Sequence, residues 1–584
     1  MRIMNAAAPS QARSLPALVL WSLCLLPATA VAEEEKGGVS VSVSEDVEVR
    51  WYRVPERIDG FPNREVLNYV EQVARVTALM SSGDWSVFTQ VDQVALFANR
   101  YYLDDELIIE REVVGSDMFS PLPGDSYANI EKLRLRLDRK AITMELGDTY
   151  AAFGRGAALN INRNVDIDID TSIQGARVVG RPGAWDLTAV IGQLNRQQVY
   201  QDNPNIGLYG DLRHMVGGVR AERFGLGPAN LGAHGVVYNF VSGEGWEEGF
   251  TGFSSTPDAV VGGTTAELMG VGGLDWYVEG DVFHYPKGSD VLVGSPCPGQ
   301  DTEATGACTG YGAYLSTAAY IGSTTWLLEG KRYLGTELVN TLTGNEFYEV
   351  ASAPTLEYER VITEDSSAAL NSGDIYGARL RMDWAAIPGK LVPYVSAAVF
   401  RDLETGGLHF NDVPETIVHP VAGVEYIADE WVLLLNAGYR VDDRDGGSGQ
   451  TGADRQLHAD VDFKFPLPGS FHGDFNVGGE RYQWGVNAFQ QEDFTEVETA
   501  TAVQYGSAVA FIGYFDVTTN PLVDTTGNLA DALYGAAEVQ VKPSSALTLK
   551  AFYGAYKAGI RCAGGQCRLL PGFEGARVSV AGTF

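Results

Sequence analysis

The sequence predicts an all-β protein, a single large antiparallel up-and-down β-barrel of about 22 strands that crosses a membrane. Apolar and polar residues alternate over segments of roughly 9 to 13 residues, the length of a tilted membrane-crossing strand. Tight turns alternate with long connections, as turns and outer loops do in outer-membrane barrels. The chain also ends in an alternating segment that terminates with an aromatic residue, Phe584.

Composition excludes several classes of protein. The 584 residues include 75 Asp and Glu against 42 Lys and Arg, a formal net charge of −33, which argues against a nucleic-acid partner. The content of hydrophobic residues (45%) is too high for disorder, and 68 glycines are too many for a helical bundle. Because no long apolar run follows the first forty residues, a helical multipass membrane protein is excluded.

The first 32 residues have the pattern of an export signal. Arg2 and Arg13 are followed by an apolar stretch over 15–27, and Ala30-Val31-Ala32 fits a cleavage site. The stretch is too short for a retained anchor, and bulky Leu23 before Cys24 argues against a lipoprotein signal. We therefore predict a signal peptide at 1–32, a barrel at 33–584, and the outer membrane of a Gram-negative bacterium as the location.

The clearest predicted hairpin covers residues 128–148, where leucines alternate with charged residues. A turn at Arg139-Lys140 predicts that Leu137 pairs with Ile142 and Leu135 with Met144, and that Arg134 lies opposite Glu145. Similar patterns recur at 378–384, 457–477 and 537–553. In a soluble sandwich the apolar face would meet a second sheet, whereas in a barrel it would meet lipid and the polar face would line the interior. The interior residues predicted from this hairpin are Arg134, Arg136 and Glu145.

The turns set the predicted strand number. Ten tight turns are expected near 82–83, 139–140, 181–183, 225–228, 272–273, 322–323, 388–389, 428–429, 466–470 and 543–544. Together with eleven longer connections they imply 22 strands, the first beginning near Val39. A hairpin hidden in 485–528, around 508–515, would give 24 strands, and one misassigned turn would give 20.

The last strand predicts how the barrel is assembled. From 573 to 584 the residues expected to face outward are Ala576, Val578, Val580, Gly582 and Phe584. A terminal aromatic on the apolar face resembles the signal that the barrel-assembly machinery reads on outer-membrane proteins. The predicted partners are thus that machinery, through the Phe584 strand, and outer-membrane lipid.

Four cysteines follow the signal peptide as two close pairs, Cys297 with Cys308 and Cys562 with Cys567. An even number in Gly-rich and Pro-rich stretches predicts local disulfides in an oxidising compartment. No histidine lies nearby, which argues against zinc. Each predicted disulfide closes a long, outer loop.

One stretch after the first clear hairpin is more specialised than the scaffold. Gly147-Asp148-Thr149-Tyr150 leads into Phe153-Gly154-Arg155-Gly156, and then Arg163 precedes three alternating aspartates, Asp166, Asp168 and Asp170. Aspartates at i, i+2 and i+4 lie on one strand face about 7 Å apart. This ladder could bind a divalent cation such as Ca²⁺, form a solvated polar face, or pair with Arg155 and Arg163 to fix an inward loop.

The same stretch resembles an uncharacterised family of large, porin-like outer-membrane barrels, best represented among Bacteroidetes, with a G-D-x-Y-x-x-F-G-R-G segment. Ala353-Pro354-Thr355-Leu356 is similar to that family's mid-barrel P-T-L element. The likeness spans about residues 80–400, while the acidic loops and cysteine pairs depart from it. The resemblance implies fold and location, not an activity.

Function is predicted as a passive or gated channel or transporter for small solutes, constricted by inward loops. Acidic loops would favour cations at the mouth. The alternative is a scaffold of a secretion or adhesion machine. No enzymatic activity is predicted, because no catalytic motif has a supporting context and most histidines are scattered, with only His458 and His472 sharing a hairpin. No cofactor is expected beyond Ca²⁺ at the acidic loops.

Overall fold

A computed structural model describes the chain at residues 38–55, 66–100, 118–119, 126–164, 169–195, 208–209, 214–239, 257–286, 307–336, 375–402, 415–428, 430–444, 452–483, 493–519, 533–556, 559–563, 566–570 and 573–583. Signal-peptide residues 1–32 and the terminal Phe584 lie outside these ranges. No helix in the described part of the chain is long and apolar enough to span a membrane.

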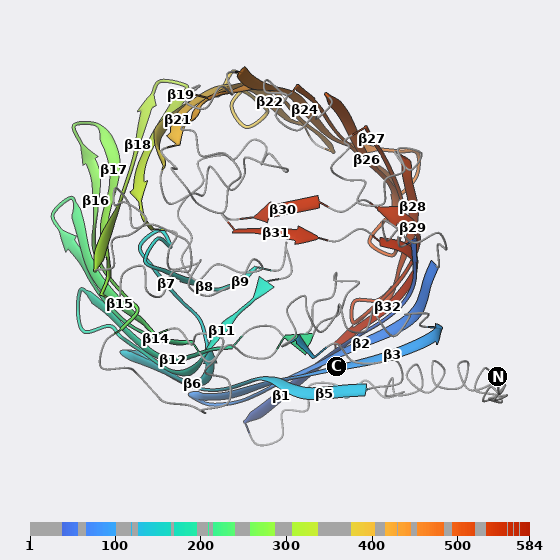
Figure 1. The fold of residues 1–584 in the computed structure, drawn as a ribbon, viewed down its shortest axis with the longest axis horizontal. Helices are drawn as coiled ribbons and strands as arrows, with labels where there is room; N and C mark the ends of the chain where they lie inside the picture. Colours follow the sequence, from blue (N-terminus) through green and yellow to red (C-terminus); the bar gives the residue numbers. More distant parts are fainter. Residues whose placement is uncertain are drawn as a thin grey trace, which may run out of the picture.

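The structure is a closed antiparallel sheet of 24 strands, and it confirms the predicted barrel (Figure 1). Each strand pairs with its neighbours in chain order, and the last closes the ring on the first, with Val580 opposite Val47. The first twelve strands are β1 (Val39–Pro55), β2 (Val66–Ser82), β3 (Trp85–Arg100), β5 (Ser126–Arg139), β6 (Ile142–Thr149), β11 (Ser172–Gly180), β12 (Trp185–Asn195), β14 (Met215–Leu226), β15 (Ala229–Asn239), β16 (Ala259–Val271), β17 (Leu274–Tyr285) and β18 (Cys308–Ile321). The other twelve are β19 (Thr324–Leu334), β20 (Ile375–Trp384), β21 (Leu391–Asp402), β22 (Glu415–Ala428), β23 (Trp431–Arg444), β24 (Gly452–Pro466), β25 (Phe471–Gln483), β26 (Phe494–Tyr505), β27 (Val509–Thr518), β28 (Leu533–Ser544), β29 (Leu547–Tyr556) and β32 (Phe573–Thr583).

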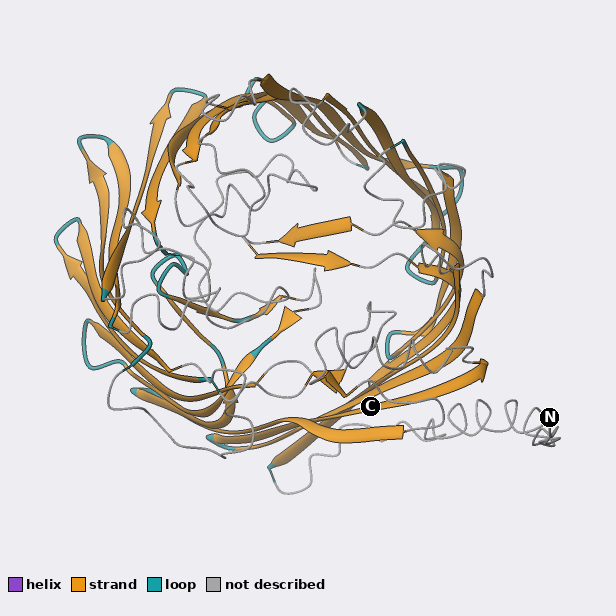
Figure 2. Cartoon of the chain, viewed as in Figure 1, coloured by secondary structure: helices purple, strands orange, loops and turns teal. Residues whose placement is uncertain are grey.

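Short two-stranded ribbons interrupt the long connections. They are β4 (Met118–Phe119) with β13 (Leu208–Tyr209), β7 (Ala151–Phe153) with β8 (Leu159–Ile161), β9 (Arg163–Asn164) with β10 (Ile169–Asp170), and β30 (Gly559–Ala563) with β31 (Gln566–Leu570). Viewed down the barrel, β7, β8, β9, β30 and β31 fall within the ring of strands (Figures 1 and 2). The connection between β6 and β11 therefore folds back over the inner wall.

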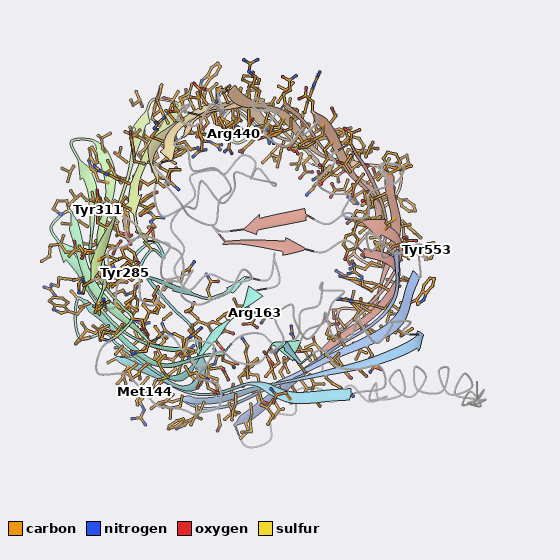
Figure 3. The ribbon with its side chains drawn as sticks, viewed as in Figure 1. Met144, Arg163, Tyr285, Tyr311, Arg440 and Tyr553 are labelled. Carbon is orange, nitrogen blue, oxygen red and sulfur yellow. The ribbon has the colours of Figure 1, made fainter. Side chains whose placement is uncertain are left out.

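The two faces of the wall differ as the alternation predicts. On the β5–β6 hairpin Leu133 and Leu146 are about half exposed on the outside, whereas Lys132 and Glu145 are buried on the inside. Figure 3 shows Met144 and Tyr553 on the outer side of the ring and Arg440 directed toward the interior. Charged groups inside and apolar groups outside are the reverse of a water-soluble protein.

Exposed aromatic side chains gather near both ends of the strands. Near the tight turns they include Trp85, Trp185, Phe224, Tyr320, Trp326, Trp384, Tyr426, Trp431, Phe471, Tyr505 and Phe511. Near the long connections the exposed rings include Trp51, Tyr376 and Tyr553. Exposed aromatic residues gathered at two levels are typical of the two interfaces of membrane-spanning barrels.

The strand number differs from the predicted 22 because residues 506–508 form a further tight turn. That turn joins β26 to β27, which is the hairpin expected if residues 485–528 hold two more strands. All ten predicted tight turns join consecutive paired strands. The one missed carries a lone Gly506, a weaker turn signal than the Gly-Gly or Pro-Gly pairs elsewhere.

The predicted register of the β5–β6 hairpin is wrong by two residues. The turn is Lys140-Ala141, so Arg139 pairs with Ile142, Leu137 with Met144, and Arg136 instead of Arg134 lies opposite Glu145. A two-residue slip leaves every side chain on its original face and still places an arginine opposite the glutamate. Alternation and charge matching therefore do not distinguish the two registers.

Candidate functional site on the inner wall of the barrel

The central feature of the interior is an inner hairpin, formed by β7 and β8 at residues 151–161. Its apolar side chains are buried against inward residues near the long-connection ends of β11–β18, and the Tyr238 hydroxyl donates to the Ala158 carbonyl at 2.6 Å. The buried cluster comprises Ala151, Phe153, Ala158, Leu159, Ile161, Ile173, Val190, Leu194, Val216, Val236, Tyr238, Ala259, Val261, Phe283, Tyr285 and Cys308. At this level of the wall the inner face also carries apolar residues, and the inner hairpin covers them.

Three consecutive residues fix the tip of the inner hairpin to the wall. The Phe153 ring occupies the space beside Gly218, where a Cβ would lie 2.6 Å from the ring. Gly154, at φ +60°, lies so close to Glu279 that a Cβ would be 1.9 Å from Oε1. The backbone N–H of Arg155 donates to Glu279 Oε2 at 2.7 Å. This contact needs a glycine at position 154.

The Arg155 side chain lies among aromatic rings. Its guanidinium carbon is 4.5 Å from the centre of the Tyr277 ring and 5.8 Å from that of Tyr314. The Tyr277 hydroxyl donates to Glu279 Oε2 at 2.5 Å, and the Tyr314 hydroxyl donates to Glu329 Oε1 at 2.7 Å. The sequence left open whether Arg155 pairs with the aspartate ladder. Its described side-chain contacts are with Tyr277 on β17 and Tyr314 on β18.

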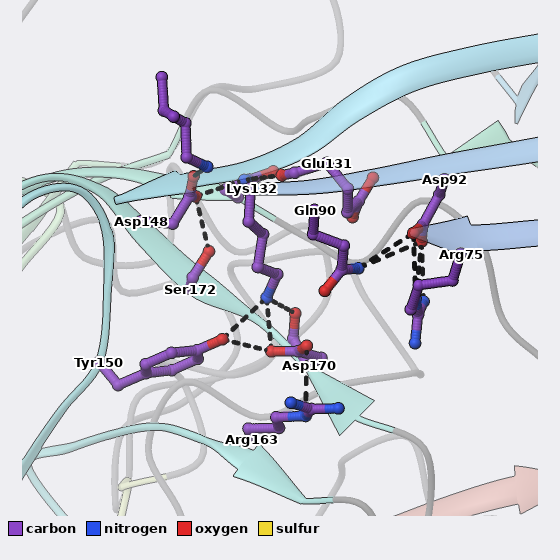
Figure 4. A network of polar contacts seen from close by, with 12 residues as sticks. Arg75, Gln90, Asp92, Glu131, Lys132, Asp148, Tyr150, Arg163, Asp170 and Ser172 are labelled. Carbon is purple, nitrogen blue, oxygen red and sulfur yellow. Dashed lines mark hydrogen bonds and ion pairs between the residues drawn. The ribbon is translucent and has the colours of Figure 1, made fainter. Parts of the chain in front are cut away.

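Asp170 lies in a second group of contacts between the β6–β11 connection and the barrel wall, shown in Figure 4. Its carboxylate forms a buried ion pair with Lys132, accepts a hydrogen bond from Tyr150 at 2.6 Å, and lies 3.5 Å from Arg163 Nε. Burial, together with the neighbouring carboxylate, raises the pKa of Tyr150 well above its usual range, so the phenol stays protonated and donates. Asp148 accepts from Ser172 at 2.9 Å and from Asn195 at 2.6 Å.

The other predicted interior residues take part in ion pairs and ring contacts on the same wall. Glu145 is buried and lies 3.1 Å from Arg177 and 3.4 Å from Arg136. Arg134 lies with its guanidinium 5.4 Å from the centre of the Phe88 ring. Their roles in conduction stay predictions.

The predicted aspartate ladder and cysteine pairs are each described in part. Asp166, Asp168 and Cys297 lie outside the described residues, so the aspartate ladder is described only at Asp170. Cys308, the first residue of β18, is disulfide-bonded. The backbones of Cys562 and Cys567 lie directly opposite each other in the β30–β31 ribbon.

Two buried histidine sites were not predicted from the sequence. His234 contacts Asp281, Nε2 to Oδ1, at 2.7 Å, and Glu279 lies beside them. His419 meets His458, Nε2 to Nε2, at 2.8 Å. His234 lies on β15 and Asp281 on β17, while His419 lies on β22 and His458 on β24. In each pair, the register across three strands brings the two residues together.

Comparisons with known proteins find matches among solved structures, but none among family models or curated sequences. No family model matches the chain, and no curated protein is similar to it in sequence. The resemblance of residues 147–156 to a barrel family therefore stays a prediction.

Solved structures that resemble the chain include the translocation pore of the P pilus usher PapC, with 10% identity, 93% of this chain and 99% of that chain covered, and a TM-score of 0.39. The siderophore receptor PirA from Pseudomonas aeruginosa shares 7% identity over 93% and 80% of the two chains, with a TM-score of 0.43. Pseudomonas aeruginosa OpdK with vanillate shares 11% identity over 73% and 98%, with a TM-score of 0.35.

Proposed function

We propose that this protein is a channel for small solutes in the outer membrane of a Gram-negative bacterium. The observation that carries the proposal is the inverted wall, a closed ring with aliphatic and aromatic side chains outside and buried charged groups inside. Closure leaves no unpaired sheet edge in lipid, and a 24-stranded ring is wider than the side chains of its own wall can fill.

The height of the outer apolar surface supports insertion in a membrane. Tyr376 and Trp384 stand on β20, one near each end, eight residues apart. At a rise of about 3.3 Å per residue they are roughly 26 Å apart along the strand, or about 20 Å along the barrel axis at a tilt of ~40°. This separation is close to the ~25 Å apolar band of outer-membrane barrels.

The inner hairpin supports a constricted channel. It is fixed to the inner wall by an apolar cluster and by the contacts of Gly154 and Arg155 with Glu279, so it narrows the space within the ring. Because the chain carries a net charge of −33, the channel is expected to favour cations over anions.

Biogenesis is part of the proposal. Residues 1–32 would direct export, and the last strand, with Phe584, would be read by the barrel-assembly machinery. Residues 1–32 and Phe584 lie outside the described residues, whereas β32 is described as far as Thr583, so the two signals rest on the sequence pattern.

Planar-bilayer recording tests the proposal directly. The purified, folded barrel, added to a lipid bilayer in KCl, is expected to give discrete current steps with a reversal potential that shows cation preference. Folded protein that inserts but gives silent bilayers, while partner proteins copurify with it, would support the scaffold alternative and refute the channel.

A further inference from the structure

One histidine and two carboxylates converge on the inner wall below the inner hairpin. His234 projects from β15, and Glu279 and Asp281 project from β17. One ligand atom from each residue lies within 4.8 Å of the others, and all three side chains are more than nine-tenths buried. Imidazole and carboxylate together form a common ligand set for divalent transition metals.

Strand register and one glycine create this convergence. His234 is opposite Gly263 on β16, and Gly263 is in turn opposite Asp281, so the three residues form one row across the wall. A Cβ at Gly263 would lie 1.9 Å from Asp281 Oδ1 and 2.4 Å from His234 Nε2. The missing side chain on the middle strand is therefore what allows the outer two to meet.

The charge at this site is unbalanced. Within the described residues, Asp281 forms an ion pair with His234 alone, and Glu279 forms none. Glu329, another buried inner-wall glutamate, is paired with Arg379 at 3.1 Å. Oε1 of Glu279 is buried and has no hydrogen-bond partner among the residues that the structure describes. A buried carboxylate oxygen without a partner is costly, and a cation at this position would remove the cost.

We propose that His234, Glu279 and Asp281 bind one divalent transition-metal cation of the Zn²⁺ type. The metal would replace the proton that now joins His234 Nε2 to Asp281 Oδ1. Ligands about 2.1 Å from a tetrahedral zinc lie about 3.4 Å apart, so small side-chain rotations from the present spacing suffice. A site with one imidazole and only two carboxylates suits zinc better than Ca²⁺, which takes six to eight oxygen ligands.

The metal site and the inner hairpin share a residue. Glu279 Oε2 accepts the Arg155 N–H, while the Phe153 ring lies 6.2 Å, centre to centre, from His234. A bound metal would fix Glu279 and, through it, the tip of the inner hairpin. The proposal concerns binding by the folded barrel and does not depend on transport.

Metal binding is measured on the full-length folded barrel in detergent after treatment with a chelator. In calorimetric titration with Zn²⁺, the wild type is expected to bind one equivalent, and His234→Ala is expected to bind at least tenfold more weakly. Co²⁺ used as a second probe should give visible d–d absorption in the wild type that is lost in the variant.

Two further variants keep the test interpretable if His234→Ala does not fold. Glu279→Gln and Asp281→Asn preserve side-chain shape while removing charge, and Asp281→Asn also keeps the oxygen that contacts His234, so each should fold and bind at least tenfold more weakly. His284→Ala is the matched control, because His284 is exposed on the outer face of β17, the strand that carries Glu279 and Asp281 on its inner face. Absence of stoichiometric binding to the wild type, or equal binding by all three site variants, would overturn the proposal. Stoichiometric binding by a barrel that gives silent bilayers would refute the channel and leave the metal site intact.

Discussion

The ammonium group of Lys132 on β5 is buried against the carboxylate of Asp170, 38 residues later in the chain. The same nitrogen donates to the Asp170 carbonyl at 2.7 Å and to the Tyr150 hydroxyl at 3.1 Å. Lys132 therefore joins the barrel wall to the end of the connection that contains the inner hairpin. Because both charges are buried, removing one leaves the other without full compensation.

Replacing Lys132 by Met is expected to lower the free energy of unfolding by about 3 kcal/mol, because within the described part of the chain it leaves buried Asp170 with only the more exposed Arg163 as a cation partner. Guanidinium unfolding of the barrel from lipid vesicles measures the change. Lys390→Met, at an exposed tight turn, is the control and should have little effect. The double variant Lys132→Met with Asp170→Asn should recover part of the loss, and strict additivity of the two single changes would contradict a direct pair.

Gly154→Ala is expected to increase single-channel conductance. The new methyl group would overlap Glu279 Oε1, and the residue would also be strained at φ +60°, so the tip of the inner hairpin must move from the wall. Gly183→Ala is the matched control, since Gly183 has φ +64° in a tight turn but nothing within 4 Å of its Cβ position. Equal conductance of the two variants and the wild type in planar bilayers would show that the inner hairpin does not limit the current.

The scaffold could be predicted from sequence because alternation, turn residues and strand length all act locally. The outward position of Leu133 and Leu146 follows from the period of two alone. Register is less well determined, since Arg134 and Arg136 serve equally well opposite Glu145 until the turn is known. Two strands were hidden because only Gly506 marks their turn.

The inner sites could not be predicted, because they depend on contacts between distant strands. His234 looks isolated in the sequence and meets Asp281 only across Gly263. The apolar cluster under the inner hairpin did leave a signal, since Val236-Val237-Tyr238 and Val282-Phe283 interrupt the alternation near strand ends. Such runs indicate apolar surroundings on both faces of a strand, here the inner hairpin on one side and the outer apolar surface, where Val282 is exposed, on the other.

Both cysteine pairs are expected to be disulfides in the exported protein. Maleimide labelling of the unfolded, unreduced protein should find no free thiol, and peptide mass mapping should find Cys297 joined to Cys308 and Cys562 to Cys567. Cys308→Ser should expose exactly one reactive thiol, at Cys297. Labelling at Cys562 or Cys567 in the wild type would contradict the second pair.

The aspartate ladder is expected to contribute to cation preference. Replacing Asp166 and Asp168 together by Asn removes two negative charges from the β6–β11 connection and keeps the buried Asp170–Lys132 pair, so the reversal potential in a KCl gradient should shift toward lower cation selectivity. A control that removes the same charge at the tight-turn rim changes Asp84 and Asp138 to Asn. Unchanged currents in the ladder variant, or an equal shift in the control, would count against a constriction at the ladder.

The outer face of the barrel can be tested with single arginines at two depths. Val219 is highly exposed in the middle of β14, whereas Ile321 is equally exposed at the tight-turn end of β18. If this face meets lipid, Val219→Arg places a charge near the bilayer midplane and should lower the free energy of unfolding by about 2–4 kcal/mol, while Ile321→Arg should cost about 0–1 kcal/mol at the interface. Guanidinium unfolding from vesicles measures both. In water an exposed valine and an exposed isoleucine would each tolerate arginine with little effect. A small and equal loss of stability at the two depths would therefore mean that these side chains face solvent. That result would refute both the membrane location and the channel that depends on it.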